Sequence, residues 1–162
     1  MGRRRSRRGA ADCISVPYWC VGSTPTQPTT MQMIIGFYPV VGDLLHAGHI
    51  LALKEAKENC DYLIVGLNCL PDGKNPTQSI YERFIQLKAV KYVDEIVPYG
   101  GRKDLELLAS SLDYQIRFLG EDYKNKDWDG KEIEESLCKT PYFLRRRHCL
   151  SSTELKERIR NG

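Results

Sequence analysis

Short apolar runs alternate with stretches of helical periodicity from Met33 to the end of the chain. This alternation is typical of a parallel sheet whose strands are joined by crossover helices. The predicted strands are Met33–Val41, Tyr62–Leu67, Glu95–Pro98, Gln115–Leu119 and Tyr142–Arg145. The predicted helices are His46–Asn59, Ile80–Lys91, Lys103–Ser111 and Ser152–Arg160. We therefore expect an α/β fold built on a doubly wound parallel sheet.

Two helix starts carry a capping-box pattern. Ser79 precedes Glu82 by three residues, and Ser151 precedes Glu154 by three. In this pattern the hydroxyl and the carboxylate satisfy backbone N–H groups that have no partner within the helix.

The pattern also predicts where a ligand binds. In a doubly wound sheet, ligands bind outside the carboxyl ends of the strands. We therefore expect the chemistry in the loops after Val41, Leu67, Leu119 and Arg145.

Charge is distributed unevenly along the chain of 162 residues. Residues 1–32 carry five arginines and one acid, whereas residues 33–162 carry 19 bases and 20 acids. A near-neutral body argues against a nucleic-acid-binding surface, which needs basic patches that neutralise several phosphates. No apolar run approaches the roughly 20 residues that span a membrane, so we expect a soluble, cytoplasmic protein.

Residues 1–32 show no hydrophobic periodicity and are rich in Arg, Thr, Pro and Ser. Such a composition cannot offset the entropy cost of ordering, so we predict a disordered leader before a domain at 33–162. A transit peptide, a myristoylation signal at Gly2 and a basic tail for nucleic acid are open alternatives to a dispensable leader.

The six cysteines lack Cys-x-x-Cys spacing and are interpreted as reduced thiols. No cysteine lies near His46 and His49 in sequence to complete a zinc set, so we predict no protein-held metal centre.

The strongest chemical signal is the segment Gly42–His49, which follows the first strand and opens the first helix. A helix start presents N–H groups and partial positive charge, and it binds phosphate readily. Gly48 puts no side chain between His46 and His49, which can both donate to phosphate oxygens. The alternative is a pair of surface or core histidines without a chemical role.

Three blocks of the chain resemble the signature blocks of the cytidylyltransferase-like nucleotidyltransferases, in particular the glycerol-3-phosphate cytidylyltransferases. They are Asp43–Ile50, Lys91–Pro98 and Leu150–Lys156, in the right order and with comparable spacing. The resemblance covers Met33 to Ile159. It implies a Rossmann-like fold, a homodimer, magnesium, and transfer of CMP from CTP to a phosphorylated alcohol with release of pyrophosphate.

The resemblance also implies roles for particular residues. His46 and His49 would stabilise the transition state at the α-phosphate, with Lys74 and Arg146 as further catalytic residues. Hydroxyls at Ser151, Ser152 and Thr153 would hold the β- and γ-phosphates. The other implied nucleotide-binding or substrate-binding residues are Val41, Asp43, Gly48, Arg83, Lys91, Glu121 and Asp122. Arg83 and Lys91 remain open to a second interpretation, as solvated helix charges.

Several positions depart from the family pattern. Val40–Gly42 replaces a Gly-x-Phe turn, His148–Cys149 replaces a Glu-Gly pair, and Glu154 stands where relatives have lysine. A carboxylate near a triphosphate repels it unless it is turned into the capping box. Gly120–Tyr123 resembles a segment that helps to select base and ribose, with altered flanks. The alternatives to a cytidylyltransferase are therefore an adenylyltransferase and a nucleotide-binding protein with impaired turnover.

Overall fold

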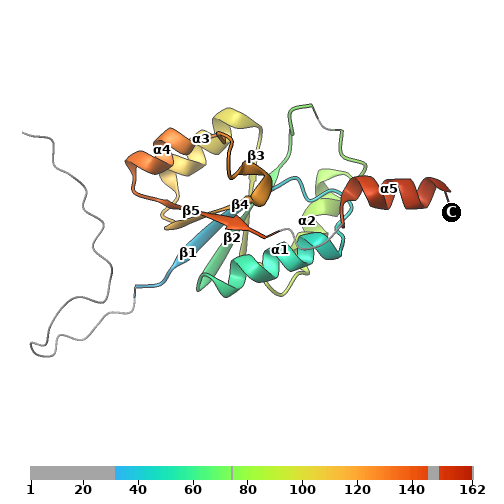
Figure 1. Ribbon diagram of the computed structural model, residues 1–162, viewed down its shortest axis with the longest axis horizontal. Coiled ribbons are helices and arrows are strands. Elements are labelled where there is room, and N and C mark those ends of the chain that lie inside the picture. Colours follow the sequence, from blue (N-terminus) through green and yellow to red (C-terminus); the bar gives the residue numbers. More distant parts are fainter. Residues whose placement is uncertain (1–31, 74, 146–149, 162) are drawn as a thin grey trace, which may run out of the picture. The chain divides into compact units, whose positions relative to one another are not determined.

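The computed structural model describes residues 32–73, 75–145 and 150–161 (Figure 1). The strands are β1 (Ile35–Val40), β2 (Tyr62–Asn68), β3 (Glu95–Tyr99), β4 (Ile116–Gly120) and β5 (Thr140–Leu144). The helices are α1 (Ala47–Glu58), α2 (Ile80–Lys88), α3 (Arg102–Ser111), α4 (Lys131–Ser136) and α5 (Ser152–Asn161), with a 3₁₀ turn η1 (Glu121–Tyr123). All strand pairs are parallel, which confirms the predicted α/β Rossmann-like fold.

The sheet has the strand order β3-β2-β1-β4-β5 and is covered on both faces. Side chains alternate along β2, so Leu63 and Val65 point to one face and Ile64 to the other. The first face packs against Leu53 of α1 and Leu87 of α2. Ile64 belongs to a second cluster, and the remaining members of that cluster are Phe37, Tyr99, Leu105 and Tyr114. Figure 1 shows α1 and α2 along one side of the sheet and α3 and α4 along the other.

Strands β1 and β4 separate before they end. β1 pairs with β2 along its whole length, from Ile35 to Val40. Within the described chain, its pairing with β4 is confined to Gly36 and Phe37. Pro39 lies beyond this point and has no backbone N–H to offer a neighbouring strand. The connections also reverse direction here, because β1 lies between β2 and β4, so this is the sheet's topological switch point.

Some predicted boundaries were wrong, and two elements were missed. The second helix ends at Lys88 rather than Lys91, and His46 is the N-cap of α1 rather than its first helical residue. Neither α4 nor η1 was predicted. Helix α4 has six residues, of which only Glu134 is buried, so it carries no apolar periodicity.

Both predicted helix caps form hydrogen bonds. The backbone N–H of Glu82 donates to Ser79 Oγ over 3.3 Å, and Glu82 Oε2 accepts from Ser79 N over 2.7 Å. At α5 the backbone N–H of Glu154 donates to Ser151 Oγ over 3.1 Å. Glu154 Oε2 is buried and has no hydrogen-bond partner among the described residues.

None of the helices in the described ranges combines the length and the apolar character that a membrane crossing requires. The predicted disorder of the leader falls almost wholly on residues 1–31, which lie outside the described residues.

We predict that Gly36→Ala lowers the free energy of unfolding by about 1–3 kcal/mol, the usual cost of overpacking a core. A Cβ on Gly36 would collide with the ring of Phe118 and lie 3.0 Å from Cys60 Sγ. Urea unfolding would measure the change. Gly120→Ala is the matched control, because a Cβ there meets nothing within 4 Å. Equal stability of the two variants would contradict the packing described for β1.

Candidate active site

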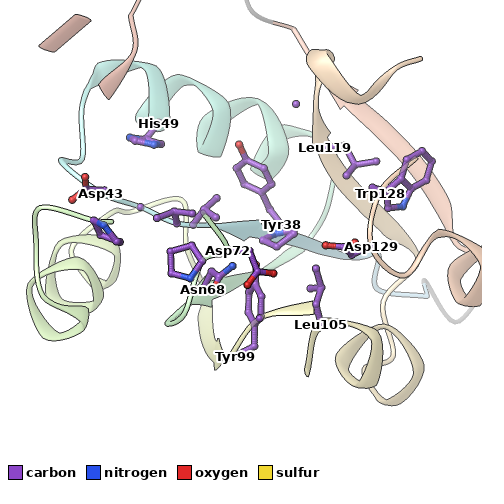
Figure 2. Close-up of a pocket in the computed structure, with 18 of the residues that line it drawn as sticks. Tyr38, Asp43, His49, Asn68, Asp72, Tyr99, Leu105, Leu119, Trp128 and Asp129 are labelled. Carbon is purple, nitrogen blue, oxygen red and sulfur yellow. The ribbon is translucent and has the colours of Figure 1, made fainter. Parts of the chain in front are cut away.

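A cavity of about 820 Å³ opens where β1 and β4 have separated (Figure 2). Its volume is within the range of about 300–1,000 Å³ that is usual for small-molecule sites. The strands contribute Tyr38 to Asp43 from β1 and the loop after it, and Arg117 to Gly120 from β4. His49 from α1 and Ser152, Thr153 and Lys156 from α5 also line it. The cavity therefore lies at the predicted place, outside the carboxyl ends of the strands.

The turn between β1 and α1 is strained. Gly42 has φ +68°, which glycine adopts readily, but Leu44 has φ +47°, a region that side-chain-bearing residues seldom occupy. The backbone N–H of Leu44 donates to Gln78 Oε1 over 2.7 Å. This long-range hydrogen bond helps to hold the turn that brings His46 to the helix start.

Asp43 joins three segments of the site. Its Oδ1 accepts from Gln78 N over 3.0 Å, and its Oδ2 lies 3.0 Å from Lys156 Nζ. Its backbone carbonyl accepts from Ser152 Oγ over 3.2 Å. Burial alone would raise the pKa of Asp43, but the N–H groups of Gln78 and Thr77 and the Lys156 ammonium outweigh it and lower that pKa. Asp43 is therefore ionised and buried, and it links the turn after β1 to the segment before α2 and to α5.

His46 and His49 form a capping box at the start of α1. His46 Nδ1 accepts from Gly48 N over 3.0 Å, and His49 Nδ1 accepts from His46 N over 3.4 Å. The two ring centroids are 4.1 Å apart. Because each Nδ1 accepts a backbone N–H, each neutral ring carries its proton on Nε2. The backbone thus fixes both rings as Nε2–H donors.

His49 is held in its neutral form. Burial, together with the neighbouring His46, lowers its pKa to about 4, and Asp43 opposes this only in part. At neutral pH the imidazole is thus a hydrogen-bond donor without a formal charge.

The start of α5 faces the same cavity. Ser152 and Thr153 line it, and Lys156 lies one helical turn further on. Ser151 caps the helix through its bond to Glu154 N. Glu154 is not among the residues that line the cavity within the described chain, so its carboxylate is not part of the cavity wall.

Arg83 and Lys91, two of the predicted binding residues, are not brought to the cavity. His46 is also not among the described residues that line it, whereas its neighbour His49 is. Arg83 is 2% exposed, and its Nη1 donates to the carbonyls of Val41 over 2.7 Å and Asn68 over 2.8 Å. It therefore ties the ends of β1 and β2 together. Lys91 lies beyond α2 on the surface, with its Nζ 5.1 Å from the centroid of Tyr92.

The remaining predicted residues divide into three groups. Val41 lines the cavity, and Gly48 is buried in the first turn of α1. Glu121 and Asp122 lie in η1, between Gly120 and Tyr123, which both line the cavity. Lys74 and Arg146 lie outside the described residues.

Sequence reasoning missed several residues of the site. Lys156 had a detectable signal, because it follows Ser152 by four positions and so shares its helical face. Gln78, Arg117 and Trp128 had none, since their contacts join segments that are far apart in the sequence.

Comparison with known proteins identifies relatives over most of the chain. A family model described as "Cytidylyltransferase-like" matches residues 37–158. The glycerol-3-phosphate cytidylyltransferase of Bacillus subtilis is 32% identical over 124 residues, which cover 72% of this chain and 90% of that protein. The ethanolamine-phosphate cytidylyltransferase of Dictyostelium discoideum is 32% identical over 123 residues, but only 34% of that longer protein is covered.

A solved structure shares the fold. The lipopolysaccharide core biosynthesis protein of Thermoplasma volcanium superposes with a TM-score of 0.60 at 25% identity. The match covers 72% of this chain and 99% of that protein.

We predict that His49 titrates with a midpoint near pH 4, which two-dimensional NMR of the imidazole resonances would measure. A lowered folded-state pKa means that the unfolded chain binds more protons between about pH 4 and 6.5. The stability contributed by neutral His49 is therefore complete above about pH 6.5 and is lost as the pH falls towards 4. His49→Asn would assign the resonance and flatten this part of the stability profile. A midpoint near 6.5 would show that the ring is not buried as described.

Proposed function

We propose that this chain, which belongs to the cytidylyltransferase-like family and is a nucleotidyltransferase, transfers CMP from CTP to a small phosphorylated alcohol. Glycerol 3-phosphate is the favoured acceptor, because the Bacillus subtilis relative named for it aligns over 90% of its length. The observation that carries the proposal is that the histidine-bearing start of α1 and the hydroxyl-bearing start of α5 meet one cavity.

The reaction needs no protein nucleophile. A phosphate oxygen of the acceptor forms a bond to the α-phosphorus of the nucleotide. The bond from that phosphorus to the oxygen bridging to the β-phosphate breaks, and the electron pair leaves with pyrophosphate. The acceptor phosphate is already anionic at neutral pH, so catalysis consists of positioning and of stabilising the charge that develops.

The described residues suit this task. The Nε2–H of His49, which lines the cavity, is an oriented donor for an oxygen of the α-phosphate. His46 keeps the same role as a prediction from the family resemblance. Ser152, Thr153 and the first N–H groups of α5 are donors for the β- and γ-phosphates. Lys74 and Arg146 stay predictions that rest on the family resemblance.

We also propose that magnesium is bound together with the triphosphate. Among the described residues, no group of three or more His, Cys, Asp or Glu side chains is arranged to hold a metal ion. Mg²⁺ does not need such a group, because it commonly keeps several waters and binds through one or two carboxylates plus substrate phosphates. Asp72, which lines the cavity, would supply a carboxylate, because both oxygens of Asp43 already accept from Gln78 and Lys156. The cation would neutralise phosphate charge.

A panel assay tests the proposal. Pyrophosphate release is measured with each of the four nucleoside triphosphates against glycerol 3-phosphate, phosphoethanolamine, phosphocholine and sugar phosphates. The proposal predicts that CTP with glycerol 3-phosphate gives the highest rate. Preference for ATP would favour the adenylyltransferase alternative, and tight nucleotide binding without release would favour impaired turnover. Sedimentation of the same sample tests the expected homodimer.

We predict that His46→Ala and His49→Ala each lower kcat and kcat/KM together by roughly 10²–10³, the usual cost of losing one such donor. The nucleotide Kd should change little, because the charge that they oppose develops only in the transition state. Melting temperature, nucleotide Kd and steady-state rate are measured on the same samples. A folded His49→Ala protein with near-normal turnover would remove the main support for the assigned chemistry.

A further inference from the structure

Trp128 forms one end of the cavity. It lies in the segment between η1 and α4 and lines the cavity wall. Figure 2 shows it beside Leu119, at the opposite end from Asp43 and His49. No motif in the sequence indicates a role for Trp128.

Three contacts hold the Trp128 indole in place. Its Nε1 donates to Glu134 Oε2 over 2.8 Å. Its ring meets that of Phe143 edge to face, with centroids 6.0 Å apart and an interplanar angle of 79°. Lys131 Nζ lies 5.3 Å from its ring centroid. Neighbours from β5 and α4 thus restrain both the orientation and the position of the ring.

Glu134 is itself fixed. It is 2% exposed, and its Oε1 accepts from Arg117 Nη1 over 2.9 Å and from Tyr114 Oη. Arg117 is also 2% exposed and lines the cavity. Moving the Trp128 indole away would leave one oxygen of a buried carboxylate without its donor, which is costly. The wall is therefore rigid, and a rigid wall discriminates ligands by size.

The stereochemistry of the transfer assigns a substrate to this end. In phosphoryl transfer the attacking and leaving oxygens lie roughly in line on opposite sides of the phosphorus. If pyrophosphate departs towards the start of α5, where Ser152 and Thr153 lie, the acceptor approaches from the opposite direction. The start of α5 is bonded to Asp43 through Ser152. Figure 2 shows Leu105 and Trp128 at the end of the cavity away from Asp43.

We propose that Trp128 is a specificity-determining residue that limits the size of the acceptor alcohol, and that Glu134 and Arg117 position it. This inference rests on the proposed nucleotidyl transfer. It predicts that the native chain prefers a three-carbon acceptor to a longer polyol phosphate.

The test compares Trp128→Ala with the native chain, using CTP with glycerol 3-phosphate or with ribitol 5-phosphate. The ratio of kcat/KM for ribitol 5-phosphate to that for glycerol 3-phosphate should rise about tenfold, because a few added atoms in a fitted pocket change discrimination by about that much. The KM for CTP should stay within about twofold of the native value, since Trp128 is assigned to the acceptor's end of the cavity. Trp128→Phe keeps the ring without the N–H donor, so an intermediate ratio is expected. Trp128→Phe also provides the test if the alanine variant fails to fold.

Tyr81→Ala is the matched control, because Tyr81 is an aromatic residue that is 73% exposed on α2 and does not line the cavity in the described chain. It should leave the ratio unchanged. A raised KM for CTP with an unchanged acceptor ratio would overturn the inference and assign Trp128 to the nucleoside. An unchanged ratio with unchanged KM would also overturn it.

Failure of the proposed function would be distinguishable. If the native chain releases no pyrophosphate with any pair, the proposed function is wrong. The Kd values of ribitol 5-phosphate and glycerol 3-phosphate are then measured by calorimetry, in the presence of the nucleotide that binds, and their ratio is compared. A ratio of Kd values that does not differ between the native chain and Trp128→Ala would refute the role of Trp128 independently of turnover.

Discussion

The site depends on the early separation of β1 from β4. Their pairing stops at Phe37, whose buried side chain anchors the last shared register position. From Tyr38 onward β1 is bonded only to β2 within the described chain, and Pro39 offers no N–H group on the opened side. The two strand ends can therefore form opposite walls of one cavity. Because this point is also where the chain changes from one face of the sheet to the other, helices from both faces border the cavity.

A second constraint is electrostatic. A polyanion site needs positive potential, yet a carboxylate, Asp43, lies in its wall and is only 8% exposed. Lys156 offsets this charge at 3.0 Å, and the N–H of Gln78 donates to the other carboxylate oxygen. Asp43 therefore links the segments of the site while the charge of the pair stays balanced. His49 is a neutral donor and adds no formal charge, so the helix starts and their N–H groups contribute positive potential instead.

The features that could be predicted from the sequence are those that depend on residues close together in the chain. Buried strands such as β2 are continuous apolar runs, and Ser79 with Glu82 forms a local cap, so both were recognised. The histidine pair was recognised because its motif lies within a single turn. Helix α4 was missed because its buried residue is a charged one, Glu134, which is stabilised by Arg117 of β4.

Arg83 and Asp43 also make contacts with residues that are distant in the sequence. From the sequence, Arg83 is consistent with either a ligand contact or a buried structural role. Only the three-dimensional structure shows that it donates to the carbonyls of Val41 and Asn68. Asp43 meets Lys156 across 113 positions of sequence, and no local pattern signals such a contact.

The central claim is that the acceptor displaces pyrophosphate directly, with the two groups on opposite sides of the α-phosphorus and no covalent intermediate on the protein. The most direct test uses CTP with a sulfur in one defined stereochemical position on the α-phosphate. The configuration of the product at that phosphorus is then determined by ³¹P NMR. A single in-line displacement predicts inversion of configuration. Retention would require two successive displacements, and hence a protein nucleophile, which would contradict the account.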